Sequence, residues 1–235
     1  VPLSTVLALL IAVALNAIKP LRKALQTIFF LPYVTNSIAI GMGFSSMFNM
    51  IGVFTDRVSK PVSYGLVNDL IRFITANSDK TNFVNFINGG STYEMNILVM
   101  IIYIVWNALP FKILVLLGGL QSINKQYYDA AKVDGTPRRR VFTHITVPLL
   151  SPMLAYVVIT GFIGGFKEYS SIVGIFGDDM KAVGTDHSLN TMVGYIYEAL
   201  GNQEGRASAA ALILFAIIFV VTMINLYVSK KKTHD

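Results

Sequence analysis

Apolar stretches separated by polar segments dominate the pattern of this sequence. Five of them are close to the length, about 20 residues, that crosses the hydrocarbon of a bilayer as a helix. They cover residues 1–18, 28–54, 95–120, 147–166 and 207–228. The pattern therefore predicts an all-α fold, a polytopic membrane helical bundle with five spans visible in this sequence.

The second apolar stretch contains a helix-breaking signal near its start. Pro32 lacks a backbone N–H, and the polar residues Thr35, Asn36 and Ser37 follow it. Such residues are typical of a helix start or of a kink inside a membrane helix. We expect the second helix to begin or to bend at this point.

Two long polar loops, residues 55–92 and 167–206, follow the second and the fourth span. In the first loop, four large apolar residues recur at helical spacing: Leu66, Leu70, Phe73 and Ile74. This spacing predicts a short amphipathic helix that lies on the membrane or on a partner.

The composition agrees with a membrane protein. The chain is 54% hydrophobic and 14% charged, with a mean hydropathy of +0.59, whereas soluble domains are about a quarter charged. High hydrophobicity excludes a disordered chain, and the absence of cysteine excludes a disulfide scaffold. Residues 1–18 lack the basic flank and the cleavage site of a signal peptide. Because the sequence starts at Val1, we expect an upstream segment to be missing and six or more spans in the full protein.

The charges of the loops indicate the orientation, because successive loops lie on alternate sides of the membrane. One side holds eleven basic and three acidic residues, and the other holds seven basic and ten acidic residues. The first side is therefore expected to be cytoplasmic, which makes the loops 55–92 and 167–206 extracytoplasmic. Anionic headgroups account for the net charge of +6 without a nucleic-acid partner.

The cytoplasmic loop between the third and fourth spans, residues 121–148, is the most informative segment. Its apolar residues predict a short amphipathic helix: Ile123, Tyr127, Ala130 and Ala131. Gly135 stands where this helix would end, since glycine adopts the left-handed conformation without steric cost. Thr136 and Pro137 are typical of the N-cap and first residue of a following helix. The small alanine side chains and the carboxylate of Asp129 suit the first helix to docking against another chain.

This loop resembles the EAA loop in the membrane-spanning subunits of bacterial ABC importers. The family pattern is usually Glu-Ala-Ala, three residues, Gly, nine residues, Ile, one residue, Leu-Pro. The matching residues are Asp129, Ala130, Ala131, Gly135, Ile145, Val147 and Pro148. Asp129 replaces the Glu and Val147 replaces the Leu, both conservatively, and the spacing matches throughout.

Further segments resemble the carbohydrate-importer branch related to the maltose permeases. They are residues 30–32, Trp106 with residues 109–111, residues 119–123, residues 195–197 and residues 207–209. Two features depart from the pattern. Asn124 stands where Pro is usual, and residues 177–180 replace a common Gly-Gly-Pro segment, which leaves the particular sugar open.

The resemblance implies that residues 1–235 form one transmembrane domain of such an importer. It implies a second permease subunit, ABC ATPase subunits that dock on the EAA loop, and an extracytoplasmic solute-binding protein. The ATPase partner, and not this chain, would be the enzyme, and closure of its dimer would turn the pathway outward. The residues implied in coupling are Asp129, Ala130, Ala131, Gly135, Arg138, Arg139 and Pro148, with the arginines also suited to acidic membrane lipid.

Aromatic and polar residues in or beside the spans are candidates for the solute pathway: Tyr103, Trp106, Asn107, Lys167 and Glu168. Aromatic rings and amides bind sugars by stacking and hydrogen bonding, although Trp106 also suits an anchoring or packing role. Lys167 and Glu168 also suit an interfacial pair at the outer end of the fourth span, and Lys112 could reach the interface by snorkelling. The spacing of Gly161 and Gly165 favours close helix packing over solute contact.

Several chemistries have no signature in the sequence. It contains no P-loop, no nucleophile elbow and no paired His or Cys, so we expect no ATP site, no catalytic residues, no cofactor and no metal site.

The sequence therefore predicts a multi-pass permease subunit of an ATP-driven sugar or oligosaccharide importer in the bacterial inner (plasma) membrane. One alternative is the same machine for glycerol phosphate, an organic anion or a polyamine. A second is an ion-coupled secondary carrier, which usually has acids embedded in its spans. A third is a structural membrane protein, in which the docking helix would have no evident use.

Overall fold

The computed structural model describes residues 1–18, 27–28, 31, 33–49, 51–52, 61–62, 65–76, 84–87, 91–177 and 189–233. The chain forms two compact units, which alternate along the sequence. Unit 1 comprises residues 1–34, 105–167 and 199–235, and unit 2 comprises residues 35–104 and 168–198.

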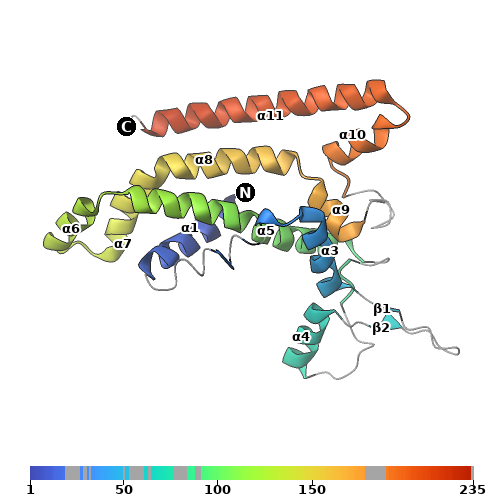
Figure 1. Ribbon diagram of the computed structural model, residues 1–235, viewed down its shortest axis with the longest axis horizontal. Helices are drawn as coiled ribbons and strands as arrows, with labels where there is room; N and C mark the ends of the chain where they lie inside the picture. The colour runs from blue at the N-terminus through green and yellow to red at the C-terminus, as the bar shows by residue number, and fades with distance from the viewer. Residues whose placement is uncertain are drawn as a thin grey trace. The chain divides into compact units, whose positions relative to one another are not determined.

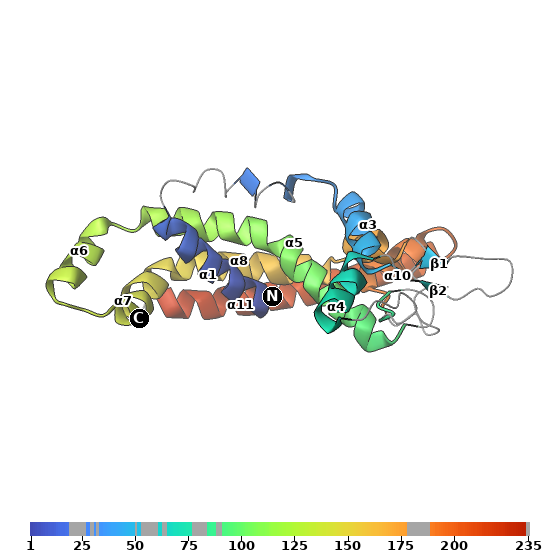
Figure 2. The ribbon, with the colours of Figure 1, turned by 90° about the horizontal axis from the view of Figure 1, so that it is seen from below.

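Unit 1 is built from long apolar helices. Its elements are α1 (Pro2–Ala17), the second part of α5 (Tyr93–Ser122), α6 (Lys125–Val133), α7 (Arg138–Val141), the π-helical turn η1 (Phe142–Thr146), α8 (Val147–Phe166) and α11 (Glu204–Thr233). Helices α8 and α11 run side by side (Figures 1 and 2), and the short helices α6 and α7 form the connection from α5 to α8.

Small residues bring α1 close to its neighbours in the core of unit 1. Ala8 and Ala12, one helical turn apart, are fully buried. They belong to one apolar cluster with Leu116 and Leu117 of α5 and Val157 of α8. Alanine loses no side-chain entropy on burial and keeps the helix axes close, so α1 contributes packing despite its short length.

Three helices of the described residues are long and apolar enough to cross a membrane, judged by length and composition. They are Tyr93–Ser122, Arg138–Phe166 and Glu204–Ser229, and they coincide with three of the five predicted spans. The first predicted span is α1, which is apolar but has only 16 residues. Pro110 and Lys112 lie inside α5 and do not end it.

The second predicted span is shorter than the sequence suggested. Helix α3 (Ser37–Phe48) has 12 residues, and Asn36 is its N-cap. The Asn36 side-chain oxygen accepts hydrogen bonds from the N–H groups of Ile38 (2.9 Å) and Ala39 (3.3 Å). The prediction of a helix start here is confirmed, and the helix ends at Phe48, before strand β1 begins at Ile51.

Unit 2 surrounds an aromatic core. It contains α3, α4 (Leu66–Thr75), the first part of α5, α9 (Ser170–Phe176), most of α10 (Met192–Leu200) and the antiparallel strands β1 (Ile51–Gly52) and β2 (Pro61–Val62). Phe48 meets Phe86 edge to face at 5.3 Å between ring centroids, and Phe44 meets Tyr103 in the same way at 5.2 Å. Such edge-to-face pairs are a favoured arrangement of buried rings.

Helix α4 is the amphipathic helix that the sequence predicts in residues 55–92. Its polar side is buried, since the Asn68 amide donates to the Val84 carbonyl at 3.1 Å and accepts from the Val84 N–H at 3.0 Å. Its large apolar residues face outward, and Phe73 is 85% exposed. The expected contact of this face with membrane or a partner stays a prediction.

Candidate functional site

The helix predicted within residues 121–148 is α6, and it begins at a capped residue. Asn124 is the N-cap, and its side-chain oxygen accepts a hydrogen bond from the Gln126 N–H at 3.0 Å. The cap satisfies one of the backbone donors that a helix start leaves free. The departure from the family pattern at Asn124 therefore preserves a defined helix start.

The end of α6 is a Schellman motif. Gly135 N–H donates to the Lys132 carbonyl at 3.1 Å, and Thr136 N–H donates to the Ala131 carbonyl at 2.9 Å. Gly135 has a φ of +64°, in the left-handed region that favours glycine. The predicted glycine stop is confirmed, and it gives α6 a rigid end.

The next helix starts one residue later than predicted. Pro137, and not Thr136, is the N-cap of α7, and its carbonyl accepts from the Arg140 N–H at 2.9 Å. Pro137 has a ψ of 145°, which is extended backbone and excludes it from the first helical turn. From Arg138 the chain continues through η1 into α8 as one helix that ends at Phe166.

The protein covers one side of α6 and leaves the other side exposed. Ala131 is buried at 5% exposure and Tyr128 is half-buried, so these residues face the protein. Tyr127 and Val133 are 54% and 89% exposed, and Ala130 and Asp129 are exposed beside them. The predicted apolar face is therefore divided, with Ala131 covered by the protein and Tyr127 and Ala130 exposed, because helical spacing does not tell which side a neighbour covers.

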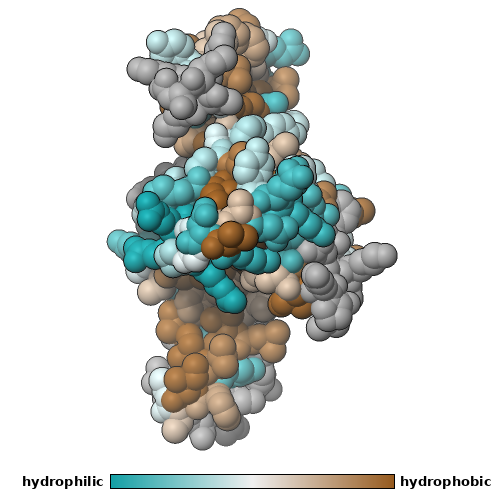
Figure 3. Space-filling view, turned by 90° about the vertical axis from the view of Figure 1, so that its left-hand side faces the viewer, coloured by the Kyte–Doolittle hydropathy of each residue, from teal (hydrophilic) through white to brown (hydrophobic). Residues whose placement is uncertain are grey.

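The outer surface at this end of unit 1 is mainly hydrophilic and carries a smaller hydrophobic patch (Figure 3). Asp129 and Lys132 are both exposed, and their side chains pair at 3.4 Å. An exposed apolar patch inside a polar rim is typical of a protein interaction surface. The small side chain of Ala130 lets a partner come close to the helix.

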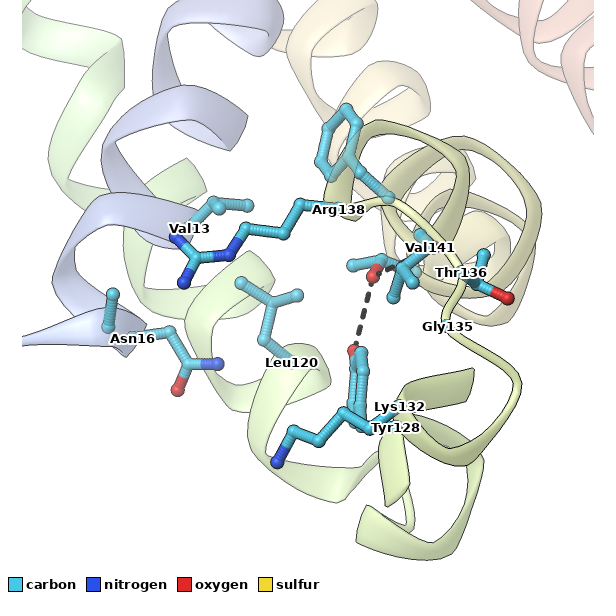
Figure 4. A pocket seen from close by; sticks show the side chains of 12 residues that line it. Val13, Asn16, Leu120, Tyr128, Lys132, Gly135, Thr136, Arg138 and Val141 are labelled. Atoms are coloured by element: carbon cyan, nitrogen blue, oxygen red, sulfur yellow. Dashed lines mark hydrogen bonds between the residues drawn. The ribbon is translucent and has the colours of Figure 1, made fainter. Parts of the chain in front are cut away.

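A cavity of about 640 Å³ lies on the protein side of α6. Figure 4 shows Lys132 of α6 and Arg138 of α7 extending into it, with Arg138 reaching toward Val13 of α1. Leu120 of α5 contributes an apolar wall. Arg139 is exposed outside the lining of this cavity. The two arginines predicted to contact the ATPase therefore differ in position, since Arg138 lines the cavity and Arg139 does not.

Pro148 lies away from the exposed face of α6. It lines a groove between α8 and α11 together with Ser151 and Asn225. The sequence placed Pro148 among the coupling residues because it ends the loop motif. The structure places it near the start of α8, directly after the π-helical turn η1.

A hydrogen bond that the sequence does not predict joins α6 to the start of α8. The hydroxyls of Tyr128 and Thr146 lie 3.2 Å apart. Eighteen residues separate the two, so no local spacing links them. The only feature of the sequence that drew attention to this region was the Asp-Ala-Ala motif directly after Tyr128.

Of the predicted solute-pathway residues, Tyr103 belongs to the core of unit 2. It is fully buried, and its hydroxyl donates to the Ser37 carbonyl at 3.0 Å. Glu168 caps α9, because its carboxylate accepts from the Ser171 N–H at 3.1 Å. Both side chains therefore hold local structure, and a role in solute passage stays a prediction.

The other predicted pathway residues lie in unit 1. Trp106 is exposed and Asn107 is half-buried on α5, and Lys167 is exposed at the end of α8. Near them in the sequence, the ring of Phe111 stacks on Tyr33 at 5.6 Å and lies 6.2 Å from Tyr156, measured between ring centroids. This row of partly exposed rings suits sugar stacking, and the sequence did not single it out.

Lys112 is buried at 3% exposure and does not snorkel. Its ammonium donates to the hydroxyls of Ser4 at 2.8 Å and Thr5 at 2.9 Å on α1. A Cβ at Gly161 of α8 would lie 3.3 Å from the Lys112 Nζ, so glycine makes room for the ammonium. Close packing is therefore confirmed at Gly161, whereas a Cβ at Gly165 would meet no atom of the described residues within 4 Å.

Comparison with known proteins identifies the family. The family model of the binding-protein-dependent transport system inner membrane component matches residues 4–234. The chain belongs to this family. It is thus a permease subunit of an ABC importer, and the alternative of an ion-coupled secondary carrier is wrong.

Several relatives of this permease are named as sugar permeases. It is 30% identical to the multiple sugar-binding transport system permease protein MsmF of Streptococcus mutans, over 96% of this chain and 70% of the relative. It is 27% identical to the arabinooligosaccharides transport system permease protein AraP of Bacillus subtilis, over 94% of this chain and 64% of the relative. The chain thus spans slightly less than two thirds of the length of AraP.

A solved structure has the same fold as this permease. It is a bacterial alginate ABC transporter in complex with an alginate pentasaccharide-bound periplasmic protein. The TM-score is 0.74 at 24% identity, over 96% of this chain and 72% of that chain. The similarity supports the helical membrane fold.

Proposed function

We propose that this permease moves a sugar or oligosaccharide across the bacterial inner membrane and is coupled to ATP hydrolysis through α6. The observation that carries the coupling role is the outer face of α6. Tyr127, Asp129, Ala130 and Val133 are exposed on a helix that is capped at both ends. A short rigid helix with an apolar, small-residue surface suits insertion into a cleft of an ATPase subunit.

The charge of the loops supports a cytoplasmic position for α6. Its loop and the other two segments expected on the same side hold eleven of the nineteen basic residues of the chain. ABC ATPases act in the cytoplasm, so α6 would face them. A solute-binding protein would then deliver solute on the opposite side, to which residues 55–92 and 167–206 are assigned.

The sugar assignment depends on the relatives and on the aromatic row of unit 1. The names of MsmF and AraP specify sugars and arabinooligosaccharides. Tyr33 and Tyr156 are about half exposed on either side of Phe111, so ring faces remain available for a sugar. We propose that this row and the neighbouring Trp106 and Asn107 line the sugar path.

The experiment that tests the assembly is purification of the tagged full-length permease from its native membrane in mild detergent, with co-purifying chains identified by mass spectrometry. We expect a second permease and a P-loop ATPase. Recovery of the protein alone, under conditions that preserve other such complexes, would contradict the proposed assembly.

A point variant tests the role of α6 within that assembly. Gly135→Val puts a β-branched residue at φ +64°, so the helix end must change. We expect the ATPase to be lost, or ATP hydrolysis to become independent of the solute-binding protein. Gly135→Asn is the matched control, because asparagine tolerates this conformation. Normal ATPase binding and stimulation in the valine variant would exclude α6 as the coupling element.

The solute is tested with the solute-binding protein of the same system. Binding of arabinotriose, raffinose, lactose, glycerol 3-phosphate and putrescine is compared by calorimetry, followed by uptake of the bound compound into proteoliposomes. Tyr156→Ala should then reduce uptake of a sugar at least five-fold without loss of assembly. Binding of only the phosphate ester or the amine would favour the non-sugar importer instead.

A further inference from the structure

Helix α6 is joined to the membrane helix α8 by a sheltered contact. Thr146 is only 6% exposed at the end of η1, and its hydroxyl lies 3.2 Å from that of Tyr128. Within the described residues, this is the only side-chain hydrogen bond between α6 and the helix that starts at Arg138. Figure 4 shows the bond beside the cavity, with Tyr128 projecting from α6 toward η1.

The two hydroxyl groups have complementary roles. Thr146 can donate to the Val141 carbonyl at 3.5 Å, within its own helix. Its oxygen can then accept a hydrogen bond from the Tyr128 hydroxyl, so both groups are satisfied. Because Thr146 is only 6% exposed, breaking the bond leaves a nearly buried hydroxyl without this partner.

The position of Thr146 in a π-helical turn gives the bond a second significance. Residues 142–146 form η1, and regular α-helix continues from Val147 to Phe166. Single π-helical turns inside α-helices are rare and occur frequently at functional sites. A force on α6 that passes through Tyr128 therefore acts at the irregular turn from which a predicted membrane span starts.

We propose that Tyr128 and Thr146 are positioning residues for coupling, which transmit the movement of α6 to α8 through their hydrogen bond. The proposal rests on the role of α6 proposed above. Ala131 packs α6 against the protein but cannot fix its direction, because a methyl group makes no directional contact. The hydrogen bond supplies that direction, so its loss should uncouple α8 while α6 still binds the ATPase.

The chain contains no cysteine, which permits a test that does not depend on the solute. Single cysteines are placed on α8 at Ser151, Ala155 and Thr160 in the complete transporter in nanodiscs. The rate of maleimide labelling is measured with and without ATP and vanadate. The reporter is the position whose rate changes most, and we expect a change of at least five-fold.

In the reporter background, Tyr128→Phe and Thr146→Val should each reduce this change to less than two-fold. ATPase subunits should still co-purify, and ATP should still be hydrolysed. The double variant should be no worse than either single variant, because both remove the same bond. Thr146→Ser keeps the hydroxyl and should retain the response. Thr143→Val is the matched control, since the exposed Thr143 hydroxyl bonds to the Arg139 carbonyl of its own helix at 3.1 Å.

Three results would overturn the proposal. An unreduced ATP-dependent change in the labelling rate of Tyr128→Phe would show that packing alone transmits the movement. The docking of α6 on the ATPase would still be tested separately by Gly135→Val. Equal losses in Thr146→Ser and Thr146→Val would show that the hydroxyl is irrelevant. No ATP-dependent change at any of the three reporters in the otherwise unchanged transporter would overturn the proposed coupling role of α6 as well.

Discussion

Gly41 of α3 and Gly174 of α9 bring the backbones of two helices into direct contact. A Cβ at Gly41 would lie 2.7 Å from the Cα of Gly174, closer than real Cβ atoms approach other atoms. A Cβ at Gly174 would in turn lie 3.0 Å from the Cα of Gly41. Glycine is therefore required on both helices, and this pair sets how closely α3 and α9 pack in unit 2.

Gly41→Ala should destabilise the protein. The added methyl group meets backbone, which cannot rotate away, and overpacking of this kind costs about 1–3 kcal/mol. Gly43→Ala is the control on the same helix, since no atom of the described residues lies within 4 Å of its Cβ position. There, alanine should be neutral or should stabilise by up to about 1 kcal/mol. Melting temperatures in detergent measure both, and equal shifts would contradict the close contact.

The environment of Lys112 predicts that removing its hydrogen-bond acceptors lowers the melting temperature more than removing its charge. Ser4→Ala combined with Thr5→Val removes two acceptors of a buried ammonium and should cost about 1.5–3 kcal/mol or more. Lys112→Met removes the charge itself, and both hydroxyls keep their hydrogen bonds to the Val1 carbonyl at 3.0 Å. The methionine variant should therefore melt at the higher temperature of the two. The reverse order would show that the ammonium is not held by these hydroxyls.

The N-cap of α6 predicts a local effect. Asn124→Ala removes the acceptor for the Gln126 N–H and should weaken the helix start by about 1 kcal/mol. Hydrogen exchange of the peptide that contains residues 124–134 should become several-fold faster. Asn124→Ser restores a capping oxygen and should exchange as the unchanged protein does. Equal exchange in the alanine variant would mean that other contacts hold this end of α6.

Two substitutions of Glu168 distinguish its structural role from a role in transport. Glu168→Gln keeps an oxygen that accepts from the Ser171 N–H, so its melting temperature should stay unchanged. Glu168→Ala loses this cap and should be less stable by about 0.5–2 kcal/mol. If the carboxylate also lines the solute pathway, Glu168→Gln should lower uptake at least several-fold in assembled transporters. Unchanged uptake in that variant would leave Glu168 with the capping role alone.

The local features of the candidate site could be predicted from the sequence because they depend on neighbouring residues. The glycine stop of α6 follows from Gly135, since the required left-handed conformation is a property of the backbone at that residue. Long apolar runs likewise predict the three long membrane helices, because bilayer thickness sets their length. The error at Pro137 is of one residue only, as expected where a helix start depends on one ψ angle.

Contacts between distant segments were decided by the tertiary structure. The sequence showed that α6 is amphipathic, yet only the structure shows that Tyr128 bonds to Thr146 of η1 while Tyr127 is exposed. Lys112 was identified as an ionisable group inside a span, but its acceptors come from α1, more than a hundred residues away.

By itself, the sequence determined the helical membrane class, the short capped helix within residues 121–148 and the likeness to importer permeases, because these follow from hydropathy, backbone preference and motif spacing. The tertiary structure decided which side of each helix is covered, which polar groups share a hydrogen bond and where two glycines must touch. The physical reason is that burial and hydrogen bonding depend on the neighbour across space, and periodicity along one helix carries no information about that neighbour.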